Sequence, residues 1–517
     1  MKKILSVCLL FATTFAWAQE SNEVAAKYAE LITQKGLKEK LTIIASAEME
    51  GRETATPGQK RAAAYIEDEF KKFGLLPGNG DSYQLKYPVF QDELISKKLQ
   101  VNGKTFEWDK DYSFGLTGIN NGDWTFNNLV FAGYGIVDSA NKINDYTGLN
   151  VSGKIVLVMD GSGAPAPAAP ATPQRGRGGF GGPTSAAGKA AAAQKAGAAG
   201  IIIIASNFPR TTATPVKGNM YLPRPNAPFM TVTVSNEVGS ALLGRPATLT
   251  TAQLKEVNKG SYSAELKLNV EKSVVNLESS DVVGILPGTD KKDEYVFLTG
   301  HYDHLGKRGD VIYYGADDDG SGTVSVLQMA EAFSAAAKKG IHPRRTIVFM
   351  TVSGEEKGLW GSQYYSEHPI FPLDKTSVDL NTDMVGRIDT ERKTGDTMNY
   401  VYVIGHDKLS SELPIINEGV NNKNTKLVLD YKYDDPNDQN RIYFRSDHYN
   451  FARMGIPILF FYDGMLQADY HKPTDTIEKI TWPLYQKRVQ LIFLTGWDMA
   501  NRDKMLKRDT PLNMPSR

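Results

Sequence analysis

Four short clusters of acidic residues and histidine, each placed after an apolar run, set the strongest constraint on how this chain folds. The runs at residues 295–298 and 346–352 are rich in β-branched and aromatic residues, which favour strands. In an open parallel α/β sheet, ligands bind in the crevice outside the carboxyl ends of the strands. The pattern therefore predicts that the clusters converge at one edge of one sheet. The clusters are His301-Tyr302-Asp303, Asp317-Asp318-Asp319, Glu355-Glu356 and Asn381-Thr382-Asp383.

Strand-like and helix-like segments alternate around these clusters. Residues 324–333 carry apolar residues at helical spacing, and residues 456–461 predict a strand that leads toward His471. Near the two ends of the chain, a helix over residues 60–73 is expected to stop at Gly74, and a last helix is expected to begin at Thr481. The alternation predicts an α/β fold with a mixed, mostly parallel sheet flanked by helices.

Residues 1–18 have the three parts of a secretory signal. Lys2 and Lys3 precede an apolar run too short to span a bilayer, and the segment ends in Ala16-Trp17-Ala18, a small-x-small cleavage site. We therefore expect a protein exported to the periplasm or secreted, with Gln19 as its mature N-terminus and no anchor after cleavage. The single cysteine, Cys8, lies in this segment, so disulfides and thiolate ligands are excluded from the mature chain.

The length of the chain and its charge limit the number of domains and the kinds of binding partner that we expect. A chain of 517 residues with 41% apolar content can bury a large core, and its length predicts two domains. The 59 basic residues balance the 59 acidic residues, which argues against nucleic acid or an anionic membrane as the partner. The sequence gives no prediction of the oligomeric state.

A second domain is predicted within the chain. Residues 128–135 and 153–158 form strand and turn patterns, and an alanine-rich helix at 188–199 leads into the buried strand 201–204. This pattern resembles the protease-associated (PA) domain, a small α/β insert. The predicted organisation is a signal at 1–18, the first part of the main domain at 19–120, the PA insert at 121–270, and the rest of the main domain at 271–517.

The residue types in the clusters suggest a pair of zinc ions. Zinc takes imidazole and carboxylate ligands, and two neighbouring ions need a shared carboxylate. His301, Glu356, Asp383, His471 and one aspartate of the 317–319 triplet would supply such a set. Glu355, beside a ligand, is then free to act as general base and later as proton donor. Asp303 is expected to accept the other imidazole N–H of His301, and Asp475 to do the same for His471.

In their order, the motifs His-x-Asp, Gly-Ala-Asp-Asp-Asp-x-Ser-Gly, Glu-Glu, Asn-x-Asp-Met and Tyr-His-x-x-x-Asp-Thr resemble the cocatalytic dizinc exopeptidase family. The resemblance covers the N-terminal helical segment and residues 274–505. It implies that Asp318 is the bridging aspartate, and that the protein is an aminopeptidase that removes N-terminal residues from peptides with two zinc ions.

Several alternatives stay open at this stage. A glutaminyl cyclase would use one zinc ion, a glutamate-type carboxypeptidase would need basic residues for the substrate carboxylate, and a receptor-like scaffold would have lost ligands. Arg52 is either a surface charge or part of a structural ion pair that ties its segment to the core. His448 is a weaker ligand candidate than His471, and Tyr462 and Tyr470 are candidates for an oxyanion site.

Overall fold

The computed structural model describes residues 23–163, 182–223, 227–466 and 468–515. The predicted signal at residues 1–18 lies outside them. The chain divides into two compact units, of which unit 1 comprises Met1–Tyr87 and Glu278–Arg517 and unit 2 comprises Pro88–Leu277. In the described part of the chain, we find no helix that is both long and apolar enough to cross a bilayer.

Unit 1 is built on a sheet with the strand order β19-β18-β20-β17-β13-β16-β12. The four strands β20, β17, β13 and β16 run parallel to one another. Strand β18 is antiparallel to β20 and parallel to β19, and β12 is antiparallel to β16. The carboxyl ends of the four parallel strands therefore lie at one edge. The bounds are β12 Gly260–Leu286, β13 Lys291–His301, β16 Arg345–Val352, β17 Thr376–Thr382, β18 Tyr400–Ile404, β19 Val428–Asp430 and β20 Ile458–Tyr462, and the short β1 Leu76–Pro77 pairs with β12.

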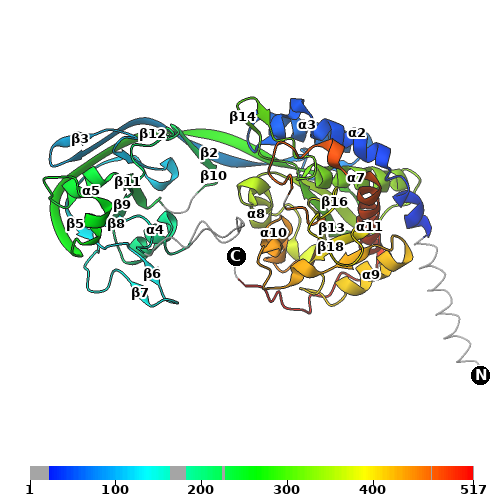
Figure 1. Ribbon diagram of the computed structural model, residues 1–517. Helices are drawn as coiled ribbons and strands as arrows, with labels where there is room; N and C mark the ends of the chain where they lie inside the picture. The colour runs from blue at the N-terminus through cyan, green and yellow to red at the C-terminus, as the bar shows by residue number, and fades with distance from the viewer. Residues whose placement is uncertain (1–22, 164–181, 224–226, 467, 516–517) are drawn as a thin grey trace, which may run out of the picture. The chain divides into compact units, whose positions relative to one another are not determined.

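Helices cover both faces of this sheet (Figure 1). Successive strand residues point to opposite faces. Val296 and Leu298 therefore belong to the hydrophobic core that also contains residues of α2, α3, α7, α9 and α11, while Phe297 packs against α8 and α10. The predicted mixed, mostly parallel sheet flanked by helices is thereby confirmed. The bounds are α2 Gln34–Ile44, α3 Pro57–Phe73, α7 Gly320–Ala337, α8 Trp360–Glu367, α9 Leu413–Lys423, α10 His448–Ala452 and α11 Trp482–Asn501.

Two predicted helix ends are also confirmed. Helix α3 stops at Phe73 because Gly74 adopts a left-handed conformation, with φ of 85°, and its N–H bonds the carbonyl of Lys71. Helix α11 begins directly after Thr481, which occupies the N-cap position. The end of α3 is set locally by Gly74, whereas the side chain of Thr481 makes no capping hydrogen bond to α11.

In unit 2, β5, β8, β9 and β11 are parallel, β12 pairs antiparallel with β5, and β4 pairs antiparallel with β11. Unit 2 begins at Pro88, before the boundary at residue 121 that we predicted, because the hairpin of β2 and β3 belongs to this unit. The strands are β2 Gln84–Val101, β3 Lys104–Phe106, β4 Tyr112–Ser113, β5 Gly122–Phe131, β8 Ile155–Met159, β9 Gly200–Ile204, β10 Lys217–Tyr221 and β11 Met230–Val234, and the helices are α4 Ala186–Lys195, α5 Asn236–Leu242 and α6 Thr251–Lys255.

Candidate metal centre

The five predicted metal ligands lie together at the carboxyl edge of the parallel strands. His301 is the last residue of β13, Asp383 follows β17, and Glu356 follows β16 in a short 3₁₀ turn. His471 comes from the loop after β20, and Asp318 comes from the loop that enters α7. Five segments that are far apart in sequence thus meet because four parallel strands end at the same edge.

The carboxylate of Asp318 lies between two imidazoles. Its Oδ1 is 3.3 Å from Nε2 of His301, and its Oδ2 is 3.2 Å from Nε2 of His471. Each imidazole has a second carboxylate nearby. Asp383 Oδ1 is 3.6 Å from His301 Nε2, and Glu356 Oε2 is 3.0 Å from His471 Nε2. We use the name position A for the site formed by His301, Asp383 and Oδ1 of Asp318. We use the name position B for the site formed by His471, Glu356 and Oδ2 of Asp318.

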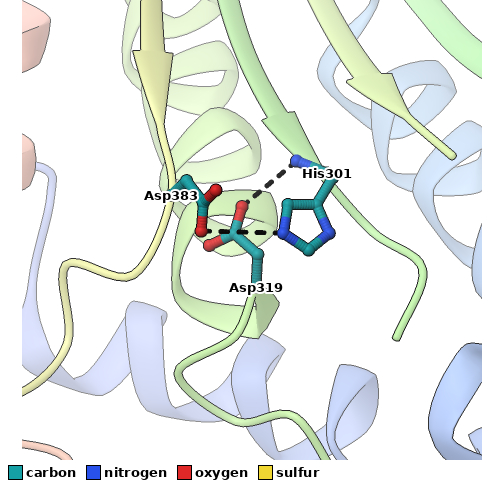
Figure 2. Close-up of side chains that lie close together, drawn as sticks. All are labelled: His301, Asp319 and Asp383. Atoms are coloured by element: carbon teal, nitrogen blue, oxygen red, sulfur yellow. Dashed lines mark hydrogen bonds and ion pairs between the residues drawn. The ribbon is translucent and has the colours of Figure 1, made fainter. Parts of the chain in front are cut away.

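Asp319 also lies beside position A, but backbone amides occupy its oxygens. Figure 2 shows its carboxylate between Asp383 and the backbone of His301, whose N–H donates to Oδ2 at 3.1 Å. Its Oδ1 accepts from the amides of Gly322 at 2.7 Å and Met384 at 3.0 Å. Asp319 therefore caps α7 and joins three loops. Within the triplet, Asp318 is the residue whose carboxylate faces both ligand histidines.

Burial and charge strongly shift the acid–base properties of the site. Burial raises the pKa of Asp318, but the imidazoles of His301 and His471 outweigh it and hold the pKa well below its ordinary value. Burial lowers the pKa of His471, but the carboxylates of Asp318 and Glu356 raise it to about 10. Burial, with the charges of Glu356 and Asp383, raises the pKa of Glu355 well above its ordinary value. These opposed shifts show a buried concentration of carboxylates that needs positive charge nearby.

The donor atoms fit a divalent cation. Among the described residues, Asp318 Oδ2, Glu356 Oε1 and both ring nitrogens of His304 are buried without a hydrogen-bond partner. Buried polar atoms in folded proteins almost always have such partners. Imidazole nitrogen and carboxylate oxygen are the donors that zinc takes in proteins. The unpaired atoms are therefore those that a zinc ion would use.

Sequence analysis missed His304, which lies at this site as well. Its Nδ1 is 2.8 Å from Glu356 Oε1 and 3.9 Å from Asp318 Oδ2. The available signal was a second histidine three residues after His301, but a neighbour of a ligand more often packs than binds. Its place beside Glu356 became visible once β13 and β16 were paired in register.

Asp303 acts differently from our expectation. Nδ1 of His301 lies 3.1 Å from the backbone carbonyl of Asp303 and 3.7 Å from its carboxylate, so the closer partner is the backbone. The carboxylate accepts hydrogen bonds from Thr54 Oγ1 at 2.6 Å and from the amide of Glu355 at 3.2 Å. Asp303 therefore holds the backbone of Glu355 in place.

Arg52 is completely buried and is not a surface charge. Its guanidinium donates to the carbonyls of Tyr302 at 2.6 Å and Gly315 at 2.9 Å, and to those of Ile44 and Tyr314, both at 2.8 Å. Tyr302 and Gly315 belong to the two segments that carry His301 and Asp318. Arg52 thus ties the N-terminal segment to the metal centre through backbone carbonyls, where we had considered an ion pair.

The contacts of Asp475 correct a further expectation, whereas those of His448 agree with its weaker candidacy as a ligand. The carboxylate of Asp475 accepts from the amides of Asp317 at 3.0 Å and Asp318 at 3.1 Å, so it orients the aspartate loop where we expected it to orient His471. His448 is buried, and its Nε2 lies 2.8 Å from the carbonyl of Tyr443. Burial lowers the pKa of His448 to about 3, so this histidine is a neutral core residue.

The fold and the site together define an α/β protein with a histidine–carboxylate centre whose donor atoms suit divalent cations. Residues 281–495 match peptidase family M28, and residues 125–242 match the PA domain. The chain thus carries an M28 peptidase domain with an inserted PA domain, which confirms the resemblance seen in the motifs. The PA match lies within the predicted insert of 121–270.

Relatives and solved structures agree with this assignment. A probable leucine aminopeptidase of Trichophyton verrucosum is 29% identical over 42% of this chain and 56% of its own. Aminopeptidase YwaD of Bacillus subtilis is 28% identical over 47% of this chain and 49% of its own. The chain thus spans about half the length of the curated relatives it matches.

Among solved structures, the aminopeptidase from Aneurinibacillus sp. strain AM-1 has a TM-score of 0.55 and 20% identity, and the match covers 95% of this chain and 100% of that one. BSAP, a zinc aminopeptidase from Bacillus subtilis, has a TM-score of 0.50 and 21% identity, with coverage of 93% and 99%. At these identities the comparison supports the shared fold.

Proposed function

We propose that this protein is a zinc aminopeptidase that uses two zinc ions to hydrolyse the first peptide bond of its substrates. The observation that carries the proposal is the carboxylate of Asp318, which faces His301 with one oxygen and His471 with the other. Such a bridge is the arrangement that two neighbouring metal ions need. The names of the relatives, which are a leucine aminopeptidase and aminopeptidase YwaD, add support.

In this proposal His301 and Asp383 would hold one zinc ion, His471 and Glu356 would hold the other, and Asp318 would contribute one carboxylate oxygen to each. When bound, zinc supplies Lewis-acid chemistry, because it polarises a carbonyl oxygen and lowers the pKa of water. The protein's own groups provide the geometry. The amides that bind Asp319 and Asp475 fix the loops from which these ligands project.

Glu355 is the proposed general base. Its Oε2 is 3.9 Å from Nε2 of His301, so the carboxylate lies at the centre without being one of the five ligands. Its backbone is held by Asp303, and the preceding Gly354 adopts a left-handed conformation with φ of 74° that turns the chain sharply after β16. From this place the carboxylate can take a proton from the attacking water and deliver it to the departing amine.

A glutaminyl cyclase and a glutamate-type carboxypeptidase remain the competing enzymes. The cyclase would bind one zinc ion, so a stoichiometry of two per chain excludes it. The carboxypeptidase would cleave peptides whose N-terminus is blocked, whereas an aminopeptidase requires a free α-amine. Metal analysis and a pair of free and N-acetylated peptides therefore separate the three.

The decisive experiment compares Glu355→Gln with the wild-type protein on a panel of aminoacyl amides. We expect turnover to fall by roughly 10³- to 10⁴-fold while zinc content is retained, since a general base is removed and the ligands stay. Glu367→Gln, in the exposed part of α8, is the matched control and should keep wild-type turnover. Near-wild-type turnover of Glu355→Gln would overturn the assignment of the base.

We also propose that the protein is exported. The support is the basic, apolar and small-residue pattern of residues 1–18. N-terminal sequencing of protein recovered from the periplasm and the medium should begin at Gln19. Protein that keeps Met1 and stays with the cytoplasmic fraction would contradict export.

A further inference from the structure

His304 is a buried histidine whose ring has no conventional partner. Its side chain is fully buried, and among the described residues neither ring nitrogen has a hydrogen-bond partner. Nδ1 nevertheless lies 2.8 Å from Oε1 of Glu356, and this oxygen has no hydrogen-bond partner either. Two buried polar atoms at this separation without a hydrogen bond would be costly unless both bind a third atom.

The backbone around His304 is organised to hold the ring in this place. Its amide donates to the carbonyl of Arg52 at 3.3 Å. Gly315 has φ of +56°, and a Cβ built on it would lie 2.5 Å from Cγ of His304, so the ring occupies the space that a side chain at 315 would need. The ring also meets that of His471 edge-on, with centroids 6.0 Å apart. The ring is therefore packed against Gly315 and His471, and its Nδ1 lies beside Glu356 of position B.

A simple ion pair between His304 and Glu356 explains the contacts less well. A protonated imidazole would donate along the Nδ1–H direction to the carboxylate, and a 2.8 Å contact would then be a strong hydrogen bond. The contact lacks that geometry, since both atoms remain without a hydrogen-bond partner. Nδ1 of His304, Asp318 and Glu356 instead present donor atoms that all lie within 4.8 Å of one another, as ligands of one ion do.

We infer that His304 binds the cation at position B directly, as a second imidazole beside His471. This inference rests on the proposed two-zinc function and adds a ligand to it. Position B then has two imidazoles, Glu356 and a share of Asp318, whereas position A has one imidazole, Asp383 and the other share of Asp318. The added imidazole makes the two positions unequal, and the ion at position B should bind more tightly.

The test measures zinc binding and does not depend on turnover. Metal-free protein is titrated with zinc in competition with a chromophoric chelator for the wild type, His304→Gln and the control His342→Gln, an exposed histidine. We expect His304→Gln to weaken one of the two affinities by about 10- to 100-fold and leave the other unchanged. The control should match the wild type. Two wild-type affinities in His304→Gln would overturn the inference.

A second measurement needs no variant and so guards against misfolding of His304→Gln. In the cobalt-substituted wild-type protein, each imidazole bound to cobalt gives a hyperfine-shifted N–H resonance. Signals from three histidines support the inference, while signals from two overturn it and leave the proposed function intact. A wild-type protein that binds fewer than two zinc ions would instead overturn the proposed function, so the two failures are distinguishable.

Discussion

Among the described residues of unit 1, histidine and carboxylates come close enough to share a cation in two places. One is the strand-end site of positions A and B, and the other, the His406 cluster, consists of His406, Asp407 and Asp434. In the His406 cluster a cation is already present, because Lys408 pairs with Asp407 and lies 3.8 Å from Oδ1 of Asp434. The imidazole of His406 contacts Asp434 directly and stacks on the ring of Tyr431.

The strand-end site differs from the His406 cluster in its charge and in the hydrogen bonding of its polar atoms. Among the described residues, no lysine or arginine forms an ion pair with Asp318, Glu356 or Asp383, and several donor atoms have no partner. In the His406 cluster the amide of Gly405 donates to Asp434 at 2.5 Å. Closeness of ligand-type atoms therefore does not by itself define a metal site. The strand-end site combines this closeness with buried donor atoms that lack a hydrogen-bond partner and with the absence of a paired lysine or arginine among the described residues.

The largest difference in zinc content and turnover should appear when one carboxylate in each cluster is exchanged for its amide and the two variants are compared. Asp318→Asn places an N–H₂ group where two ions would share oxygens, so we expect bound zinc to be lost and turnover to fall by about 10³-fold or more. Asp434→Asn should retain two zinc ions and wild-type turnover, with a loss in free energy of unfolding of about 1 to 3 kcal/mol. Elemental analysis and urea unfolding measure both.

This comparison fails if the zinc content of Asp434→Asn drops or that of Asp318→Asn does not. The first result would mean that the His406 cluster binds metal despite Lys408. The second result would mean that zinc binding at the strand-end site does not require the carboxylate of Asp318.

An intermediate effect, on stability, is expected from replacing Arg52, the buried cation whose hydrogen bonds support the strand-end site. Arg52→Met removes charged hydrogen bonds to four carbonyls and leaves those carbonyls buried, so we expect a loss in free energy of unfolding of about 3 to 5 kcal/mol. Urea unfolding in excess zinc measures it. Arg308→Met is the matched control, since Arg308 is exposed and pairs at the surface with Glu53, which should cost less than about 1 kcal/mol. Equal losses in free energy of unfolding in the two variants would show that the buried hydrogen bonds of Arg52 stabilise the fold no more than a surface ion pair does.

The smallest effect is a change in the pH dependence of stability, which tests whether His448 is a neutral core histidine. The folded pKa of His448 is about 3, below its ordinary value of 6.5, so between these values the unfolded chain binds a proton that the folded chain does not. Its contribution to stability is complete above pH 6.5 and falls by about 1.4 kcal/mol per pH unit as the pH drops below that value. His448→Gln should remove this slope between pH 6.5 and 5 in urea unfolding, and the exposed His368→Gln should keep it. An unchanged slope in His448→Gln would refute a neutral core histidine.

Much of the fold and most of the candidate site followed from the sequence. The apolar, β-branched and aromatic runs at 295–298 and 346–352 predicted strands, and the parallel order of these strands brought their carboxyl ends to one edge. What could not be predicted depends on neighbours in space. The backbone carbonyl of Asp303 competes with its own carboxylate for His301, and Asp475 reaches across to the amides of the aspartate loop.

The sequence by itself determined the α/β class, the end of helix α3 and four of the five side chains that gather at the strand ends, because each depends on local periodicity or on chain order. The choice of Asp318 within its triplet came from the family resemblance. The tertiary structure decided that the carboxylate of Asp318 faces both histidines, while that of Asp319 is held by amides. It also showed the burial of Arg52 and placed His304 beside Glu356. The physical reason is that hydrogen-bond satisfaction and burial depend on the atoms that other segments bring near, and strand register fixes which atoms those are.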